Sequence, residues 1–95
     1  MMSDNEVYVS KIIMNLCKPN EIKYMLYMFS IGGIDITTAK VLDMTGMSQT
    51  GYWLARKSLT KRKWIKYIDT YTVAINYSQI FKDGAAAGIL NPLDE

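Results

Sequence analysis

The sequence predicts one domain of the α+β class that is mainly α-helical and has a C-terminal two-stranded β-hairpin. Three observations predict this class. Apolar side chains recur at helical intervals in four successive segments, Gly46 separates the third segment from the fourth, and alternating aromatic and β-branched residues follow the fourth. The chain has 95 residues, 49% of them hydrophobic, which is enough for one compact core. We therefore expect residues 1–82 to form a single domain.

The first helix is predicted over residues 4–17. Its start has the S-x-x-E spacing of a capping box, from Ser3 to Glu6, and apolar residues then follow at helical intervals. The alternative for this region is a strand through residues 7–10.

A second helix is predicted to begin after the break at Pro19 and to end before Gly32. One of its sides is apolar at the i, i+3, i+4, i+7 positions, and so is the opposite side, with Tyr24, Tyr27, Met28 and Ile31. A helix that is apolar on both sides lies at the centre of the core or is shared with a partner subunit, and we favour the core. The apolar surplus also motivates the prediction of a homodimer built on the N-terminal helices.

Two short helices are predicted on either side of Gly46. Thr37 or Thr38 caps the first, and an inward-facing apolar stripe follows over residues 39–44. Ser48 caps the second, which extends to residue 59 or 60. Two short helices joined by a glycine turn are typical of a helix-turn-helix.

A hairpin is predicted from residues 64–68 and 71–75, which are rich in aromatic and β-branched residues and flank a tight turn at Asp69-Thr70. The short apolar alternation at residues 34–36 fits a single edge strand. After the hairpin, residues 76–82 fit a brief helical turn. The next residues are small and poor in core-forming side chains, so residues 83–95 are predicted to be a flexible tail.

The composition argues against several classes of protein. There is no histidine and only one cysteine, so we expect no structural zinc, no disulfide within the chain and no histidine-dependent catalysis. Glu21, Asp35 and Asp43 are scattered rather than paired as an acid and a base. No apolar stretch approaches the roughly 20 residues that span a bilayer, and the N-terminus is unlike a secretory signal. We therefore expect a cytoplasmic protein that is not an enzyme and has no cofactor, metal, small-molecule substrate or membrane partner.

The positive charge is concentrated in one part of the chain. The net charge is only +2, but six of the eleven basic residues lie between Met44 and Ile68, where no acidic residue occurs. A solvated helix face followed by a charged turn explains most such clusters. Here the cluster directly follows the predicted helix-turn-helix, which favours a nucleic-acid partner. Its members are Arg56, Lys57, Lys61, Arg62, Lys63 and Lys66.

The order of these elements resembles the winged helix-turn-helix superfamily over residues 4–75. The resemblance implies a protein that binds double-stranded DNA, with the second helix of the motif in the major groove and the hairpin, or wing, on the adjacent backbone. In that helix Gln49 can make a paired hydrogen bond to adenine, and Thr50 can contact a thymine methyl group or a phosphate. Arg56 and Lys57 lie one to two turns further along.

Several of these candidate DNA-binding residues have a plain structural alternative. Ser48 is expected first as a helix cap and only second as a phosphate contact. Trp53 either packs under the wing or stands exposed beside the DNA backbone. Lys61, Arg62 and Lys63 form either a phosphate-binding turn or an ordinary charged turn, and Lys66 in the wing strand points to solvent or to DNA. Tyr52, Ala55 and Leu59 are expected to face the core.

A narrower resemblance links two runs to small plasmid and phage replication-initiation proteins of the winged-helix type. These runs are KPNEIK at residues 18–23 and AINYSQIFKDG at residues 74–84. One departure concerns the turn before the wing, where many winged helices have glycine and this chain has Lys63-Trp64.

The leading hypothesis is therefore DNA binding by a plasmid or phage protein that acts in replication initiation or its control. The alternatives are a winged-helix transcriptional regulator, a partition protein that binds a centromere, and a protein–protein interaction module that does not bind DNA.

Overall fold

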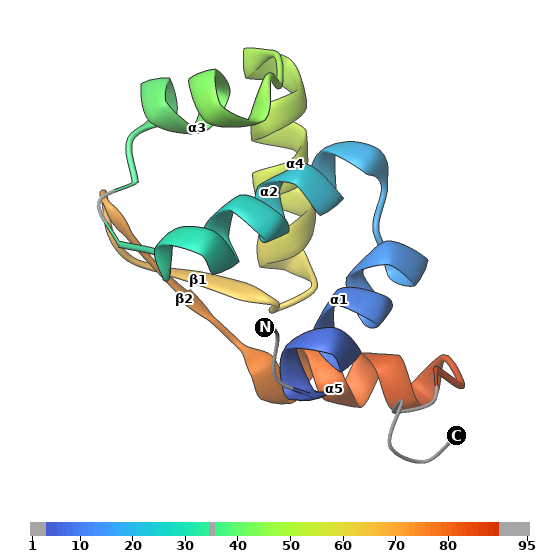
Figure 1. Ribbon diagram of the computed structural model, residues 1–95. Helices are drawn as coiled ribbons and strands as arrows, with labels where there is room; N and C mark the ends of the chain where they lie inside the picture. Colours follow the sequence, from blue (N-terminus) through green and yellow to red (C-terminus); the bar gives the residue numbers. More distant parts are fainter. Residues whose placement is uncertain (1–3, 35, 90–95) are drawn as a thin grey trace.

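The computed structural model describes residues 4–34 and 36–89 and confirms the expected α+β, mainly helical class. Within these residues, five helices and a two-stranded antiparallel sheet follow one another along the chain (Figure 1). The elements are α1 (Asp4–Leu16), α2 (Pro19–Ile31), α3 (Thr38–Thr45), α4 (Gln49–Lys61), β1 (Ile65–Asp69), β2 (Thr72–Ile75) and α5 (Tyr77–Ala86). Residues 7–10 are helical, so the alternative of a strand at this place is wrong.

Helix α2 lies at the centre of the core, as we favoured from its two apolar sides. It packs against α1, α3 and α4, and its Tyr24, Met25 and Met28 side chains are fully buried. Tyr27 and Ile31 are partly buried against the same core. The second apolar side of α2 is thus covered largely by the chain's own elements.

The predicted caps of the two short helices are present. Thr37, rather than Thr38, caps α3 by accepting a hydrogen bond from the Lys40 backbone N–H at 3.2 Å. Gly46 ends α3 in the left-handed conformation, with a φ of 70°, and its N–H donates to the Leu42 carbonyl oxygen. Local sequence signals therefore set both ends of α3.

The hairpin pairs β1 with β2 in antiparallel register, with Ile65 opposite Ile75 and Tyr67 opposite Val73. Ile34 and Ile36 are not part of a strand, and Asp35, the middle residue of the predicted edge strand, lies outside the described residues. The backbone on either side of this segment is nevertheless hydrogen-bonded to the second strand of the hairpin and to the residue before it. The Gly33 carbonyl oxygen accepts from the Val73 N–H, and the Ile36 N–H donates to the Tyr71 carbonyl oxygen, both at 2.8 Å. A Cβ atom on Gly33 would collide with the Val73 carbonyl oxygen, so only glycine allows this close approach.

The hairpin is followed by a further helix, which corrects the prediction of a brief helical turn and a tail from residue 83. Helix α5 continues to Ala86 and lies beside α1 (Figure 1). Gly84 is buried against Ile12, and the Tyr8 hydroxyl donates to the Ile89 carbonyl oxygen at 3.1 Å. The absence of a side chain at Gly84, which suggested a tail, instead lets α5 approach α1 closely. The rest of the predicted tail, residues 90–95, lies outside the described residues.

No helix in the described part of the chain is long and apolar enough to cross a bilayer.

Candidate nucleic-acid interface

Helix α4 has one buried side and one exposed side. Tyr52, Ala55 and Leu59 are buried, as expected from their spacing, and Gly51 is buried beside the Asn20 side chain. On the opposite side, since residues three and four apart share a face, seven exposed residues form what we call the α4 face. They are Gln49, Thr50, Trp53, Leu54, Lys57, Thr60 and Lys61.

Ser48 begins this helix as its cap. Its side-chain oxygen accepts a hydrogen bond from the Gly51 N–H at 3.0 Å, and the residue itself is exposed. The capping role expected first for Ser48 is therefore present. Gln49 and Thr50 directly follow the cap, at the helix end where N–H groups point outward.

A buried carboxylate attaches α4 to α2. Glu21 is 3% exposed, and its two oxygens accept hydrogen bonds from the Ser58 hydroxyl at 2.6 Å and from the Lys18 N–H at 2.8 Å. Arg62 lies 3.8 Å from the same carboxylate and donates to the Leu16 carbonyl oxygen at 2.8 Å. These contacts hold α4 against α2 and fix the direction of the exposed face.

Arg62 is therefore separated from the two lysines beside it. Its guanidinium points to the junction of α1 and α2, whereas Lys61 and Lys63 are exposed. The sequence grouped these three residues as one turn, which was either phosphate-binding or an ordinary charged turn. The structure gives Arg62 a structural partner in Glu21, so we leave it out of the candidate interface.

Arg56 lies between two aromatic rings at the edge of the α4 face. Its guanidinium carbon is 3.8 Å from the centre of the Tyr67 ring and 4.7 Å from that of Trp53. Trp53 is 47% exposed, so it does not pack under the hairpin, whereas Trp64 is buried. Cation–π contacts of this kind hold an arginine side chain in place without neutralising its charge.

The hydroxyl of Tyr67 is anchored in the core. It lies 2.6 Å from the Tyr24 hydroxyl, and burial raises the pKa of Tyr24 to about 12. Burial also raises the pKa of Tyr67, and the hydrogen bond to Tyr24 raises it further. Both phenols are neutral at physiological pH, so Arg56 meets an uncharged ring rather than a phenolate.

A groove of about 650 Å³ separates the C-terminal half of α4 from the hairpin. Three basic residues line it, Arg56, Lys63 and Lys66, together with the polar Thr60 and Asn76. Lys66 is exposed on β1, in agreement with its expected outward direction. We call this hollow the basic groove.

Lys63 has a left-handed backbone conformation, which glycine adopts more readily than other residues. Its φ is 64°, and it is the only non-glycine residue with a positive φ in the described part of the chain. At the departure that we noted, Lys63-Trp64, a lysine therefore has a conformation that favours glycine. Lys63 lines the basic groove, and its positive φ carries a steric cost that glycine would not have.

Sequence reasoning missed Tyr67, Thr60 and Asn76 as parts of this surface. Tyr67 was assigned to a strand, and no local pattern connects it with Arg56. Asn76 carries a helix-cap signal, since its side-chain oxygen accepts from the Gln79 N–H, but nothing in its neighbours indicates that it borders a basic groove.

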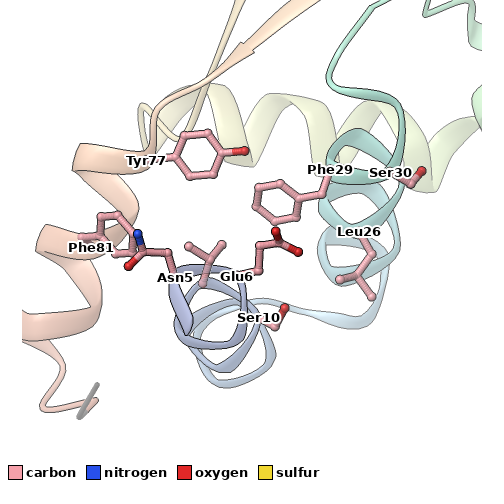
Figure 2. A pocket seen from close by; sticks show the side chains of 9 residues that line it. Asn5, Glu6, Ser10, Leu26, Phe29, Ser30, Tyr77 and Phe81 are labelled. Atoms are coloured by element: carbon pink, nitrogen blue, oxygen red, sulfur yellow. The ribbon is translucent and has the colours of Figure 1, made fainter. Parts of the chain in front are cut away.

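A second groove, of about 720 Å³, lies between α1, α2 and α5 (Figure 2). Its walls are largely apolar, with Val9, Leu26, Phe29, Tyr77 and Phe81, and its rim is polar. The rings of Phe29 and Tyr77 stack with their centres 5.7 Å apart. We call it the apolar groove.

Comparison with protein-family models, with curated proteins and with solved structures found no match for this chain.

Proposed function

We propose that this chain binds double-stranded DNA in the manner of a winged helix-turn-helix protein and performs no catalysis. In this proposal α4 enters the major groove and the hairpin contacts the adjacent backbone. The observation that carries it is the charge on this side of the molecule. Lys57, Lys61, Lys63 and Lys66 are exposed, and no salt bridge pairs them with a carboxylate in the described part of the chain.

The order of polar side chains along α4 supports a division of roles. Gln49 and Thr50 lie next to the N-terminal cap, the part of a recognition helix that contacts base edges, and glutamine pairs with adenine through two hydrogen bonds. Lys57 and Lys61 lie further along the same face, where they reach phosphates. Base contacts would carry the sequence preference and phosphate contacts most of the affinity.

The biological role that we propose is replication initiation, or its control, on a plasmid or phage. It is supported by the two short runs of similar sequence and by the position of Asn76, which follows the hairpin and caps α5. A transcriptional regulator or a partition protein would use the same DNA-binding surface. Selection of bound fragments from the protein's own genetic element would distinguish these roles, because it reports which sites are bound.

Salt dependence tests DNA binding itself. The affinity for a duplex, measured by fluorescence anisotropy at several salt concentrations, should fall steeply as salt rises, because each neutralised phosphate releases counterions. An affinity that does not depend on salt, or no binding at low salt, would contradict the proposal.

The apolar groove supports the second candidate, a protein–protein interaction module. Apolar surface of this kind is buried in protein complexes, and their affinity depends only weakly on salt. This candidate would be favoured if the chain captured a protein partner with an affinity that high salt leaves unchanged.

A further inference from the structure

The basic groove differs from an ordinary charged surface in how its charges are placed. Arg56 comes from α4, Lys63 from the turn after α4, and Lys66 from β1, so three separate pieces of backbone bring positive charge to one hollow. No carboxylate side chain is among the residues that line it. Three positive charges in one groove repel one another, and a bound anion would offset this repulsion.

Of the three cations in the basic groove, Arg56 is the one that aromatic rings contact. Trp53 and Tyr67 contact its guanidinium, and Tyr67 is itself held by Tyr24. A guanidinium confined in this way loses little conformational entropy when it binds, and its planar fork matches two oxygens of a phosphate. The exposed lysines can then approach the remaining oxygens as point charges.

We infer that the basic groove seats a single phosphate group of a nucleic-acid backbone, with Arg56 as its principal ligand and Trp53 and Tyr67 as the residues that position Arg56. This inference rests on the proposed function, because it takes the phosphate to belong to bound DNA. It adds that one backbone strand passes between α4 and the hairpin. It also assigns Arg56 to the backbone, so that reading of the bases is left to Gln49 and Thr50.

The first experiment tests the groove without DNA. Inorganic pyrophosphate is titrated into the isotope-labelled protein, and sodium acetate keeps the ionic strength constant. The amide and arginine Nε–H resonances are followed by NMR. We expect shifts at Arg56, Lys63, Lys66 and Asn76. The double variant Lys63→Gln/Lys66→Gln should lose most of this response.

The second experiment measures the same double variant with a DNA duplex. The slope of log affinity against log salt should decrease by about one, the value expected for one lost phosphate contact. A control with the same change of charge away from the groove is Lys23→Gln/Lys82→Gln, on α2 and α5, which should keep the slope of the unmodified protein.

A third comparison tests the positioning role. Trp53→Leu removes the ring beside Arg56, whereas Trp53→Phe keeps an aromatic face there. We expect the leucine variant to lose the pyrophosphate-induced shift at the Arg56 Nε–H while the amide spectrum stays folded, and the phenylalanine variant to retain it. Equal shifts in both variants would overturn the positioning role of Trp53.

The outcomes separate this inference from the proposed function. If the groove double variant binds duplex with an unchanged salt slope and responds to pyrophosphate like the unmodified protein, the phosphate site is overturned and DNA binding stands. If pyrophosphate shifts the groove residues but no duplex binds, the proposed function fails and the anion site stands. If neither ligand binds, both are overturned.

Discussion

The two arginines of the chain show how surroundings decide the role of a residue. Arg62 pairs with the buried Glu21 and donates to the end of α1, whereas Arg56 lies against Trp53 and Tyr67 at the basic groove. Both belong to the same acid-free stretch of sequence. One guanidinium stabilises the fold, and the other remains available to an anion.

Arg62→Ala should therefore lower the free energy of unfolding by about 2 kcal/mol, because it removes charged hydrogen bonds and leaves Glu21 with one partner fewer. Urea unfolding followed by circular dichroism measures this change. Arg56→Ala is the matched variant and should alter stability less and DNA affinity more. If Arg62→Ala weakened DNA binding and left stability unchanged, the assignment of Arg62 to the fold would be wrong.

Lys63→Gly should raise the free energy of unfolding by about 1 kcal/mol, because glycine adopts a positive φ without the steric cost that a side chain carries. It should also weaken DNA binding, since it removes one charge from the basic groove. Lys63→Ala loses the same charge and keeps the strained backbone. The difference in thermal unfolding temperature between the two variants isolates the strain, and equal temperatures would contradict it.

At the scale of elements, α4 is an amphipathic helix with one side buried in the core and the other exposed. Tyr52, Ala55 and Leu59 attach it to the core, and Ser58 adds a hydrogen bond to Glu21 on α2. A reading helix must be held rigidly, because base recognition depends on hydrogen bonds with narrow geometry. In the proposed complex with DNA, the buried side of α4 would therefore matter to specificity as well as to stability.

Gln49→Ala should cost about 1–3 kcal/mol in binding to a preferred site and leave binding to random duplex nearly unchanged, because a base-edge contact is lost while phosphate contacts remain. Anisotropy titrations with a selected and a scrambled duplex measure the two values. Equal losses on both duplexes, or none on either, would exclude Gln49 as the reading residue and turn attention to the hairpin around Lys66.

Helix α5 is held to the domain partly by a hydrogen bond between two side chains. The Trp64 indole N–H donates to the Asp83 carboxylate at 2.6 Å, and Trp64 is 1% exposed. Asp83→Ala should lower the free energy of unfolding by about 2 kcal/mol, because the indole N–H is left without an acceptor. Asp83→Asn keeps an oxygen acceptor and should lose less. If alanine and asparagine had the same small effect, α5 would not depend on this bond.

For the whole molecule, the two grooves lie on different sets of elements. The basic groove belongs to α4 and the hairpin, and the apolar groove to α1, α2 and α5. A DNA ligand and a second protein chain could occupy them without competing for the same residues. The homodimer predicted from the N-terminal helices would use the apolar groove, since two of the α2 residues that motivated it, Tyr24 and Met28, are buried and the other two are partly buried.

Sedimentation at micromolar concentration tests this dimer. We expect a dimer for the unmodified chain and a monomer for Leu26→Glu, because Leu26 is 41% exposed and lines the apolar groove, where a buried charge is costly. Lys23→Gln, on the same helix and outside the groove, is the control and should remain dimeric. A monomer for the unmodified chain, both free and with DNA, would contradict the prediction.

Local sequence patterns determined much of the fold. The spacing of apolar residues located α1 to α4, Ser48 and Gly46 marked helix ends, and alternating β-branched residues located the hairpin. These signals succeed because helix periodicity, capping and strand alternation depend on residues only a few positions apart. They also separated the buried side of α4 from its exposed side.

Only the tertiary structure decided the features that depend on distant residues. Gly84 packs on Ile12, which places α5 in the folded domain, although its own sequence resembles a tail. Arg62 turns toward Glu21, and Arg56 lies on Tyr67, although all four look like surface or strand residues in their local context. The physical reason is that burial and ion pairing are set by whichever side chains the fold brings together, and a local pattern does not contain those partners.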